Sequence, residues 1–95
     1  MIDPAAFAAH IGTDFTVDAG GHPVVLQLAE VTDDGVAQGL HTFSLFFHGP
    51  GDRLLPQQIH TMTHPALGAH DIFIVAVQGS TAARILYQAC FSVPA

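Results

Sequence analysis

After Gly12, apolar residues recur at every second position in successive runs, and this alternation constrains the fold more than any other feature. Successive side chains of a strand point to opposite faces, so each run predicts a strand with one apolar face. Clusters of Gly, Pro and Asp separate the runs and supply turns. The expected strands span residues 13–18, 24–32, 40–48, 57–64, 72–77 and 84–93.

Two local signals refine this pattern. Asp33-Asp34-Gly35 predicts a hairpin, because Asp-Gly tolerates the positive φ of such turns, so strands 24–32 and 40–48 should be antiparallel neighbours. Asp3 and Pro4 predict the start of a short helix, which Gly12 ends. A helix of about two turns is marginal alone, so we expect Phe7 and Ile11 to dock it onto the strands.

Residue parity within the strands predicts which side chains point inward. His60 and His64 share a face with Met62 in the most polar of the expected strands. This pattern is typical of a strand at the edge of a sheet, or of one that covers the core only thinly. The run 72–77 is apolar on both faces and should be central in the sheet or covered on both sides. Cys90 should be a small buried thiol. Phe46 should face outward. The expected core contains Phe43, Leu45, Phe47, Phe73, Ile74, Tyr87 and Phe91.

These elements predict an all-β fold in one domain, residues 1–95. The strands should form a small six-stranded antiparallel barrel or sandwich, with the short N-terminal helix closing an open end. A hydrophobic content of 49% with only 11% charged residues indicates a folded chain with an unusually uncharged surface.

Charge and cysteine content exclude several classes of function. With no Lys, two Arg and a net charge of -6, the chain lacks the cationic field needed to bind nucleic acid. The single Cys90 forbids an internal disulfide. The longest apolar run, 72–77, is too short to span a membrane, and the first residues do not resemble a signal peptide, so we expect a cytoplasmic protein.

Short motifs along almost the whole chain resemble a family of small bacterial proteins of about one hundred residues, a domain of unknown function. They are Ile11-Gly12-Thr13, Phe43-Ser44-Leu45, Gly49-Pro50, Leu55-Pro56-Gln57, His64-Pro65, Ile72-Phe73-Ile74-Val75 and Tyr87 with Ala89 and Phe91. The resemblance implies an association with phage-tail-collar-like or tail-fibre-like proteins and supplies no catalytic residues. Relatives tend to have an aromatic residue where this chain has His60, and basic residues around 47–49 that it lacks.

Seven His residues raise the possibility of a metal site, with His60, His64 and His70 as weak candidates. On a strand, His60 and His64 would lie about 13 Å apart, too far for one ion. A site would require the strand to break at His64-Pro65, with His70 or His48 folding in. We therefore expect no metal and no cofactor.

Catalytic chemistry has no clear candidate either. Ser44, Ser80, Ser92 and Cys90 are the possible nucleophiles besides Thr, and none lies on a sharp glycine-flanked turn of the kind that exposes one. The sequence therefore predicts a protein that is not an enzyme.

Exposed apolar residues and unprotected strand edges are the remaining functional signal. A chain without Lys lacks the commonest edge-protecting residue, unless a closed barrel removes its own edges. We expect a structural or assembly subunit that forms a homo-oligomer or docks on a protein partner, in a phage-tail-like or filamentous assembly. A binding module using the barrel mouth is the alternative, and a His-based metal-dependent protein the third possibility. The candidate interface residues are Phe46, His48, Leu54, Leu55 and Leu86.

Overall fold

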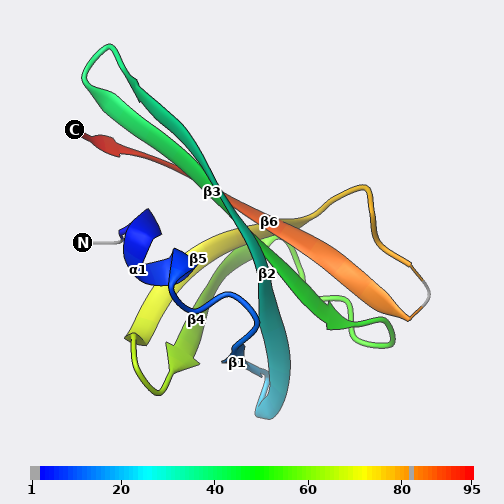
Figure 1. Cartoon of the computed structure of the whole chain (residues 1–95). Coiled ribbons are helices and arrows are strands. Elements are labelled where there is room, and N and C mark those ends of the chain that lie inside the picture. Colours follow the sequence, from blue (N-terminus) through cyan, green and yellow to red (C-terminus); the bar gives the residue numbers. More distant parts are fainter. Residues whose placement is uncertain (1–2, 82) are drawn as a thin grey trace.

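The chain forms a closed barrel of six antiparallel strands in a computed structural model that describes residues 3–81 and 83–95 (Figure 1). Around the barrel the strand order is β1-β2-β3-β6-β5-β4, with β4 closing against β1. The all-β prediction is confirmed, and of the two expected forms the barrel is the one found. The elements are α1 Pro4–Ala8, β1 Asp14–Ala19, β2 His22–Ala37, β3 Leu40–Pro50, β4 Gln58–His64, β5 Gly68–Ala76 and β6 Arg84–Pro94.

Strands β2 and β3 pair antiparallel as predicted, but their turn lies at Gln38 and Gly39. Both residues have positive φ, 54° and 78°, as the two central residues of a type I′ hairpin turn require. The predicted turn residues 33–35 instead form a bulge, where one extra residue of β2 opposes β3. Asp33 Oδ1 accepts a hydrogen bond from the Gly35 N–H at 2.9 Å, so the Asp and Gly residues stabilise the bulge.

Helix α1 begins as the sequence predicts and packs through one aromatic residue. The Asp3 side chain accepts from the Ala5 N–H at 3.0 Å. Phe7 is buried against Phe15, with 5.8 Å between ring centroids. Ile11 does not help to dock the helix, because it lies past the helix end and is 48% exposed. Within the described residues no helix is long and apolar enough to cross a membrane.

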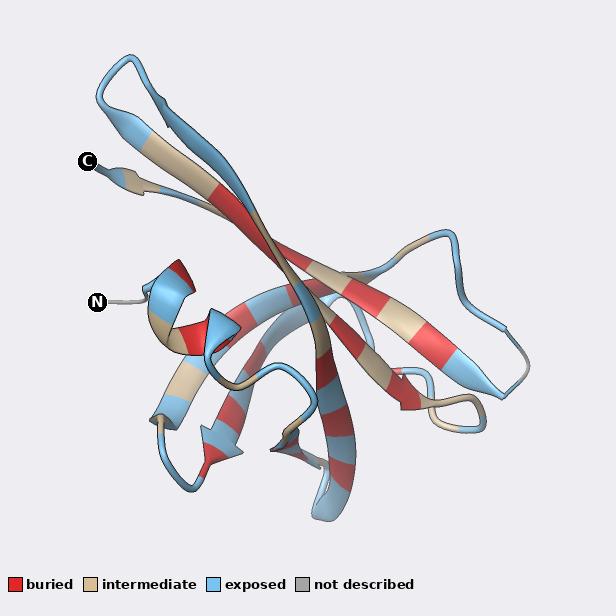
Figure 2. Ribbon diagram, viewed as in Figure 1, coloured by how far each residue is buried: buried red, intermediate tan, exposed pale blue. Residues whose placement is uncertain are grey.

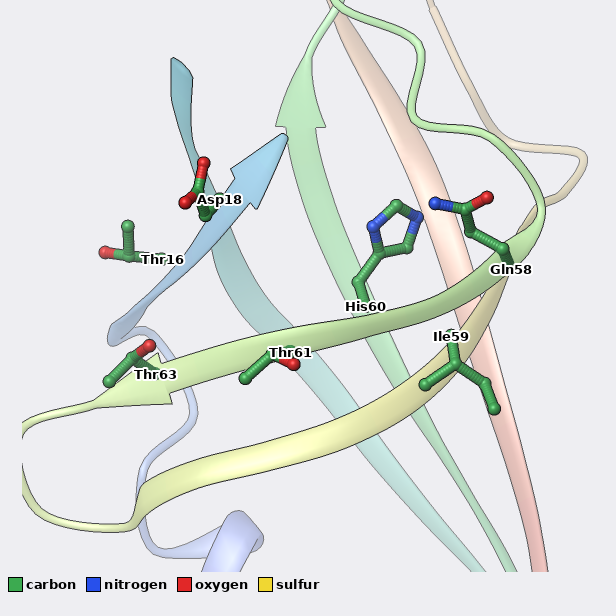
Figure 3. Close-up of a pocket in the computed structure, with 7 residues that line it drawn as sticks. All are labelled: Thr16, Asp18, Gln58, Ile59, His60, Thr61 and Thr63. Carbon is green, nitrogen blue, oxygen red and sulfur yellow. The ribbon is translucent and has the colours of Figure 1, made fainter. Parts of the chain in front are cut away.

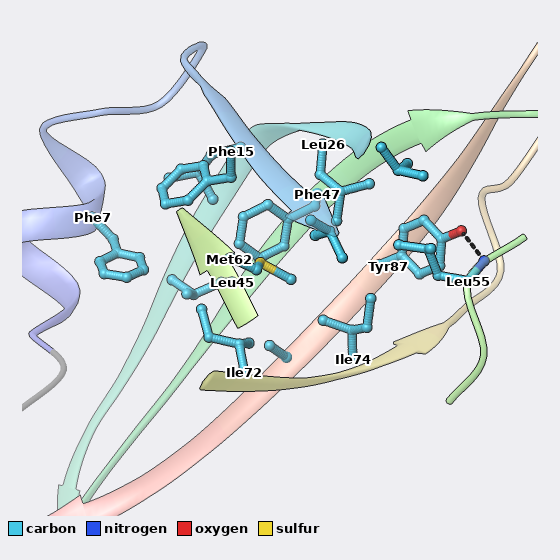
Figure 4. Close-up of a cluster of buried hydrophobic side chains, with 14 of the residues drawn as sticks. Phe7, Phe15, Leu26, Leu45, Phe47, Leu55, Met62, Ile72, Ile74 and Tyr87 are labelled. Atoms are coloured by element: carbon cyan, nitrogen blue, oxygen red, sulfur yellow. Dashed lines mark hydrogen bonds between the residues drawn. The ribbon is translucent and has the colours of Figure 1, made fainter. Parts of the chain in front are cut away.

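The barrel interior is filled by the inward-facing residues of all six strands together with Phe7 and Leu55. Figure 2 shows buried and exposed residues alternating along the strands, and Figure 4 shows the cluster that they form. The largest side chains with less than 2% exposure are Tyr87, Phe7, Phe15, Phe43, Phe47, Leu26, Leu28, Leu45, Met62, Ile72 and Ile74.

Two positions predicted to be buried are wrong, Phe73 in β5 and Cys90 in β6. Phe73 is 49% exposed because Ile72 and Ile74 on either side of it point inward. The outer face of β5 is therefore not covered there. Cys90 is exposed, with its Sγ atom 3.2 Å from Ser44 Oγ on the outer face.

Strands β2, β3 and β6 are longer than the others and project beyond the barrel as a three-stranded extension (Figure 1). β1 covers β2 only over residues 22–27, and β5 pairs with β6 only at Tyr87 and Gln88. Among the described residues, no strand pairs with the far side of β2 or β6 in the extension. The prediction that β4 is an edge strand is therefore wrong, because β4 lies between β1 and β5. We define the arm as residues 30–37, 40–46 and 88–94; at its base, Phe43, Leu45 and Ala89 still belong to the buried core.

Candidate functional site

The three histidines considered as metal ligands lie in or beside the barrel, and each bonds to its own neighbours. His60 and His64 both point inward from β4, as their parity predicts. His70, on β5, packs edge-on against Phe7 at 5.5 Å between centroids, and its Nε2 atom donates to the Leu67 carbonyl at 2.8 Å. In residues 3–81 and 83–95, no three side chains of the His, Cys, Asp or Glu type gather as a metal site would require.

His64 connects the turn after β4 to the segment before β1. Its Nδ1 atom accepts from the N–H groups of Ala66 and Leu67 at 3.0 and 3.2 Å, so the proton of the neutral ring is on Nε2. Nε2 donates to Thr13 Oγ1 at 2.9 Å, and that hydroxyl donates to the His10 carbonyl at 2.6 Å. Burial lowers the pKa of His64 below its usual value, and the positive charge of the nearby His10 lowers it further.

His60 is buried but keeps one ring nitrogen open. The residue is 6% exposed, and Nε2 donates to the Pro56 carbonyl at 2.9 Å, which leaves the lone pair of the neutral ring on Nδ1. Nδ1 has no hydrogen-bond partner in the described part of the chain, where no fully buried side-chain nitrogen or oxygen lacks one. Nδ1 is therefore open to solvent, and Figure 3 shows the ring in the gap between β1 and β4.

This gap is a cleft at the closing seam of the barrel. β1 and β4 pair only at Thr16–Thr63 and Val17–Met62, although both strands continue beyond these pairs. Two adjoining cavities of about 530 and 310 Å³ open where the strands diverge, and they share three lining residues. We call them together the seam cleft. The lining side chains with polar or charged groups are Thr16, Asp18, Arg53, Gln58, His60, Thr61 and Thr63.

The 53–56 loop forms one wall of the seam cleft and is fixed by the barrel core. The Tyr87 hydroxyl accepts from the Leu55 N–H at 2.9 Å and donates to the Arg53 carbonyl at 3.3 Å (Figure 4). Leu55 is consequently buried, which removes it from the predicted interface residues. Leu54 is 69% exposed beside the cleft.

The other predicted interface residues lie together on the opposite part of the barrel wall. Phe46, His48 and Leu86 line one groove of about 330 Å³ on the outer face of β2, β3 and β6, with Ala29 and Glu30. We call this the outer groove. Burial lowers the pKa of His48, and the charge of Arg84 lowers it further. The structure therefore brings three of the five candidates together, whereas Leu54 lies at the seam cleft.

Sequence reasoning missed the seam cleft because its residues carry no common motif. Asp18 is the last residue of the expected strand 13–18, and its Oδ1 atom accepts from the Gly21 N–H of the following turn at 3.0 Å. Arg53 and Gln58 are ordinary surface residues in the sequence. The one available signal was that the alternation of the strand places His60 on its inward face, since a buried imidazole requires partners for both ring nitrogens.

Comparison with known families bears out one part of the resemblance, a domain of unknown function that covers almost the whole chain. The sequence profile described as Domain of unknown function (DUF6916) matches residues 2–91. The chain belongs to the DUF6916 family. Comparisons with curated proteins and with solved structures gave no match. The seam cleft, the outer groove and the arm are therefore the candidate functional features of this DUF6916 member.

Proposed function

We propose that this chain is a non-enzymatic, cytoplasmic assembly subunit that pairs with a second copy of itself through the open edge of β6 in the arm. The observation that carries the proposal is that β6 continues to Pro94, whereas its pairing with β5 ends at Gln88. An unpaired strand edge presents N–H and C=O groups to another chain.

The main-chain groups of even-numbered residues at this edge, such as Ser92, point away from β3. The Ala95 N–H donates to the Gly39 carbonyl at 3.0 Å, so odd-numbered residues of β6 bond towards β3. On the opposite side of β6, the Leu86 carbonyl accepts from the Val77 N–H at 2.9 Å. Alternation along the strand therefore leaves the main-chain groups of Ser92 available to a second strand.

Charge favours the β6 edge over the β2 edge as the contact between copies. Residues 89–94 contain no charged side chain, whereas β2 carries Glu30, Asp33 and Asp34 in the arm. Two copies that each have a net charge of -6 repel one another, and two acidic β2 edges would add to this repulsion. Pairing β6 with β6 brings uncharged strands together and keeps the acidic strands apart.

The geometry of the contact determines the form of the assembly. Antiparallel pairing of two β6 edges is two-fold symmetric and closes as a dimer. The outer groove around Phe46, His48 and Leu86 remains available, and a head-to-tail contact there would extend the dimers into an open assembly. The filamentous or phage-tail-like form of assembly that we propose would need this second contact.

The alternative functions have less support. A small apolar ligand in the barrel mouth would compete with the core side chains that fill the interior and with Phe7 of α1. A metal-dependent function would require ligands to converge, and His60, His64 and His70 each bond to separate partners.

The experiment is sedimentation velocity over a wide range of protein concentration, with variants of Ser92. Ser92→Pro removes an N–H that faces away from β3, and Pro is tolerated at such edge positions, so the barrel should fold while the dimer dissociates. Ser92→Ala is the matched control: it loses the hydroxyl bond to Thr42 but keeps the N–H, and should dimerise as the native chain does. A strictly monomeric native chain, or equal association of Ser92→Pro and the native chain, would overturn the proposal.

A further inference from the structure

The seam cleft combines a buried ring, an open ring nitrogen and a mixed set of polar groups outside the arm. We propose that it binds a neutral polyhydroxylated small molecule, such as a monosaccharide. This site is independent of the β6 edge, because its residues come from β1, β4 and the 53–56 loop.

The floor of the cleft carries the strongest indication of a ligand. His60 is more than nine-tenths buried, and its Nε2 atom is held by the Pro56 carbonyl at 2.9 Å. Nδ1 therefore has a fixed direction and presents a lone pair to the cleft (Figure 3). A polar atom positioned in this way is suited to accept a hydrogen bond from a hydroxyl group.

The walls supply partners for further hydroxyl groups. Asp18 offers carboxylate oxygens, which only accept, while Thr16 and Thr63 offer hydroxyls that donate and accept. The Gln58 amide also does both. Sugar hydroxyls both donate and accept, so they match this mixture better than a ligand with acceptors only.

The charges at the cleft favour a neutral ligand. Asp18 and Arg53 bring opposite charges to the cleft, so a ligand with a net charge of either sign meets one like charge. Leu54, Pro56 and Ile59 give the cleft an apolar boundary, against which the C–H groups of a sugar ring can pack.

The test is a titration of the isotope-labelled full chain, followed by backbone amide NMR shifts. Glucose, galactose, mannose and arabinose are the neutral probes, and putrescine and glutarate are the cationic and anionic probes. We expect at least one sugar to give saturable shifts at Asp18, Gln58 and His60, with millimolar affinity. Saturable shifts with putrescine or glutarate alone, shifts outside the seam cleft, or no saturation with any of the sugars would overturn the proposal.

Variants locate the binding. Asp18→Asn should weaken sugar binding about tenfold, because it replaces a charged acceptor, while the amide oxygen can still accept from Gly21. Asp14→Asn is the matched control, since Asp14 is also exposed on β1 but lies outside the cleft. His60→Leu should remove binding while the spectrum remains that of a folded chain. Equal weakening by Asp14→Asn and Asp18→Asn would contradict the assignment.

Discussion

The barrel and the arm share the same strands but bury their apolar faces to different extents. In the barrel, Phe47 on β3 is fully buried because the opposite wall lies across the interior. In the arm, Phe91 stacks on Phe43 with 5.1 Å between centroids but stays partly exposed, and Val36 near the tip is 62% exposed. Alternation therefore specifies the strands, whereas burial depends on whether another wall closes over them.

The largest expected effect is on stability, and it measures this difference in burial. Phe47→Ala should lower the free energy of unfolding by about 3–5 kcal/mol, because it leaves a cavity in the packed interior. Phe91→Ala in the arm should cost about 1–2 kcal/mol, since less apolar surface is lost from contact. Urea unfolding of both variants checks the prediction. Equal losses would mean that the arm is as tightly packed as the barrel.

Residue parity was sufficient to predict the strands and most of the core. Phe43, Leu45 and Phe47 lie inward and Phe46 outward, and β4 presents His60 and His64 to the interior. Parity failed at Phe73, where both faces of the strand are apolar and only the pairing of β5 with its neighbours decides which one is buried.

Apart from the pairing of β2 with β3, the lengths and pairings of the strands could not be predicted from local signals. Gly49 and Pro50 predict the end of the strand at residue 48, yet β3 continues through Pro50. Packing favours Gly49 there, because a Cβ atom on it would lie 2.6 Å from Leu26 Cδ2 and 3.0 Å from Tyr87 Cε2, and these core side chains would have to shift. The seam cleft and the arm both result from unequal pairing lengths around the barrel, which a single strand's sequence does not encode.

A second, smaller effect should appear on lowering the pH, and it should affect the barrel rather than the arm. The folded-state pKa of His64 lies below that of the unfolded chain, near 6.5. Well above pH 6.5 the ring is neutral in both states and its full contribution to stability is present. As the pH falls below this value, the unfolded chain takes up a proton first, so stability is lost until the folded ring is also protonated.

His64→Asn tests this prediction, because the Asn oxygen can accept from the 66 and 67 N–H groups without titrating. Its urea midpoint should vary less between about pH 7.5 and 5 than that of the native chain. His10→Phe is the control: it removes the neighbouring charge, keeps an aromatic ring beside His64 and should retain most of the pH dependence. An unaltered pH profile in His64→Asn would assign the dependence to other groups, with His48 first because burial lowers its pKa too.

The smallest expected effect is that of salt concentration on dimerisation. Its sign distinguishes pairing of the uncharged β6 edges from a contact between opposite charges. At physiological ionic strength, screening extends over about 8 Å, so copies with a net charge of -6 still repel as their uncharged β6 edges approach. Raising the NaCl concentration should therefore strengthen dimerisation of the native chain by a few-fold in sedimentation experiments, while Ser92→Pro stays monomeric. Weakening of the dimer by salt would instead indicate that Arg53 or Arg84 contacts acidic residues of the second copy. The β6 edge would then not be the contact, because none of its residues 89–94 is charged.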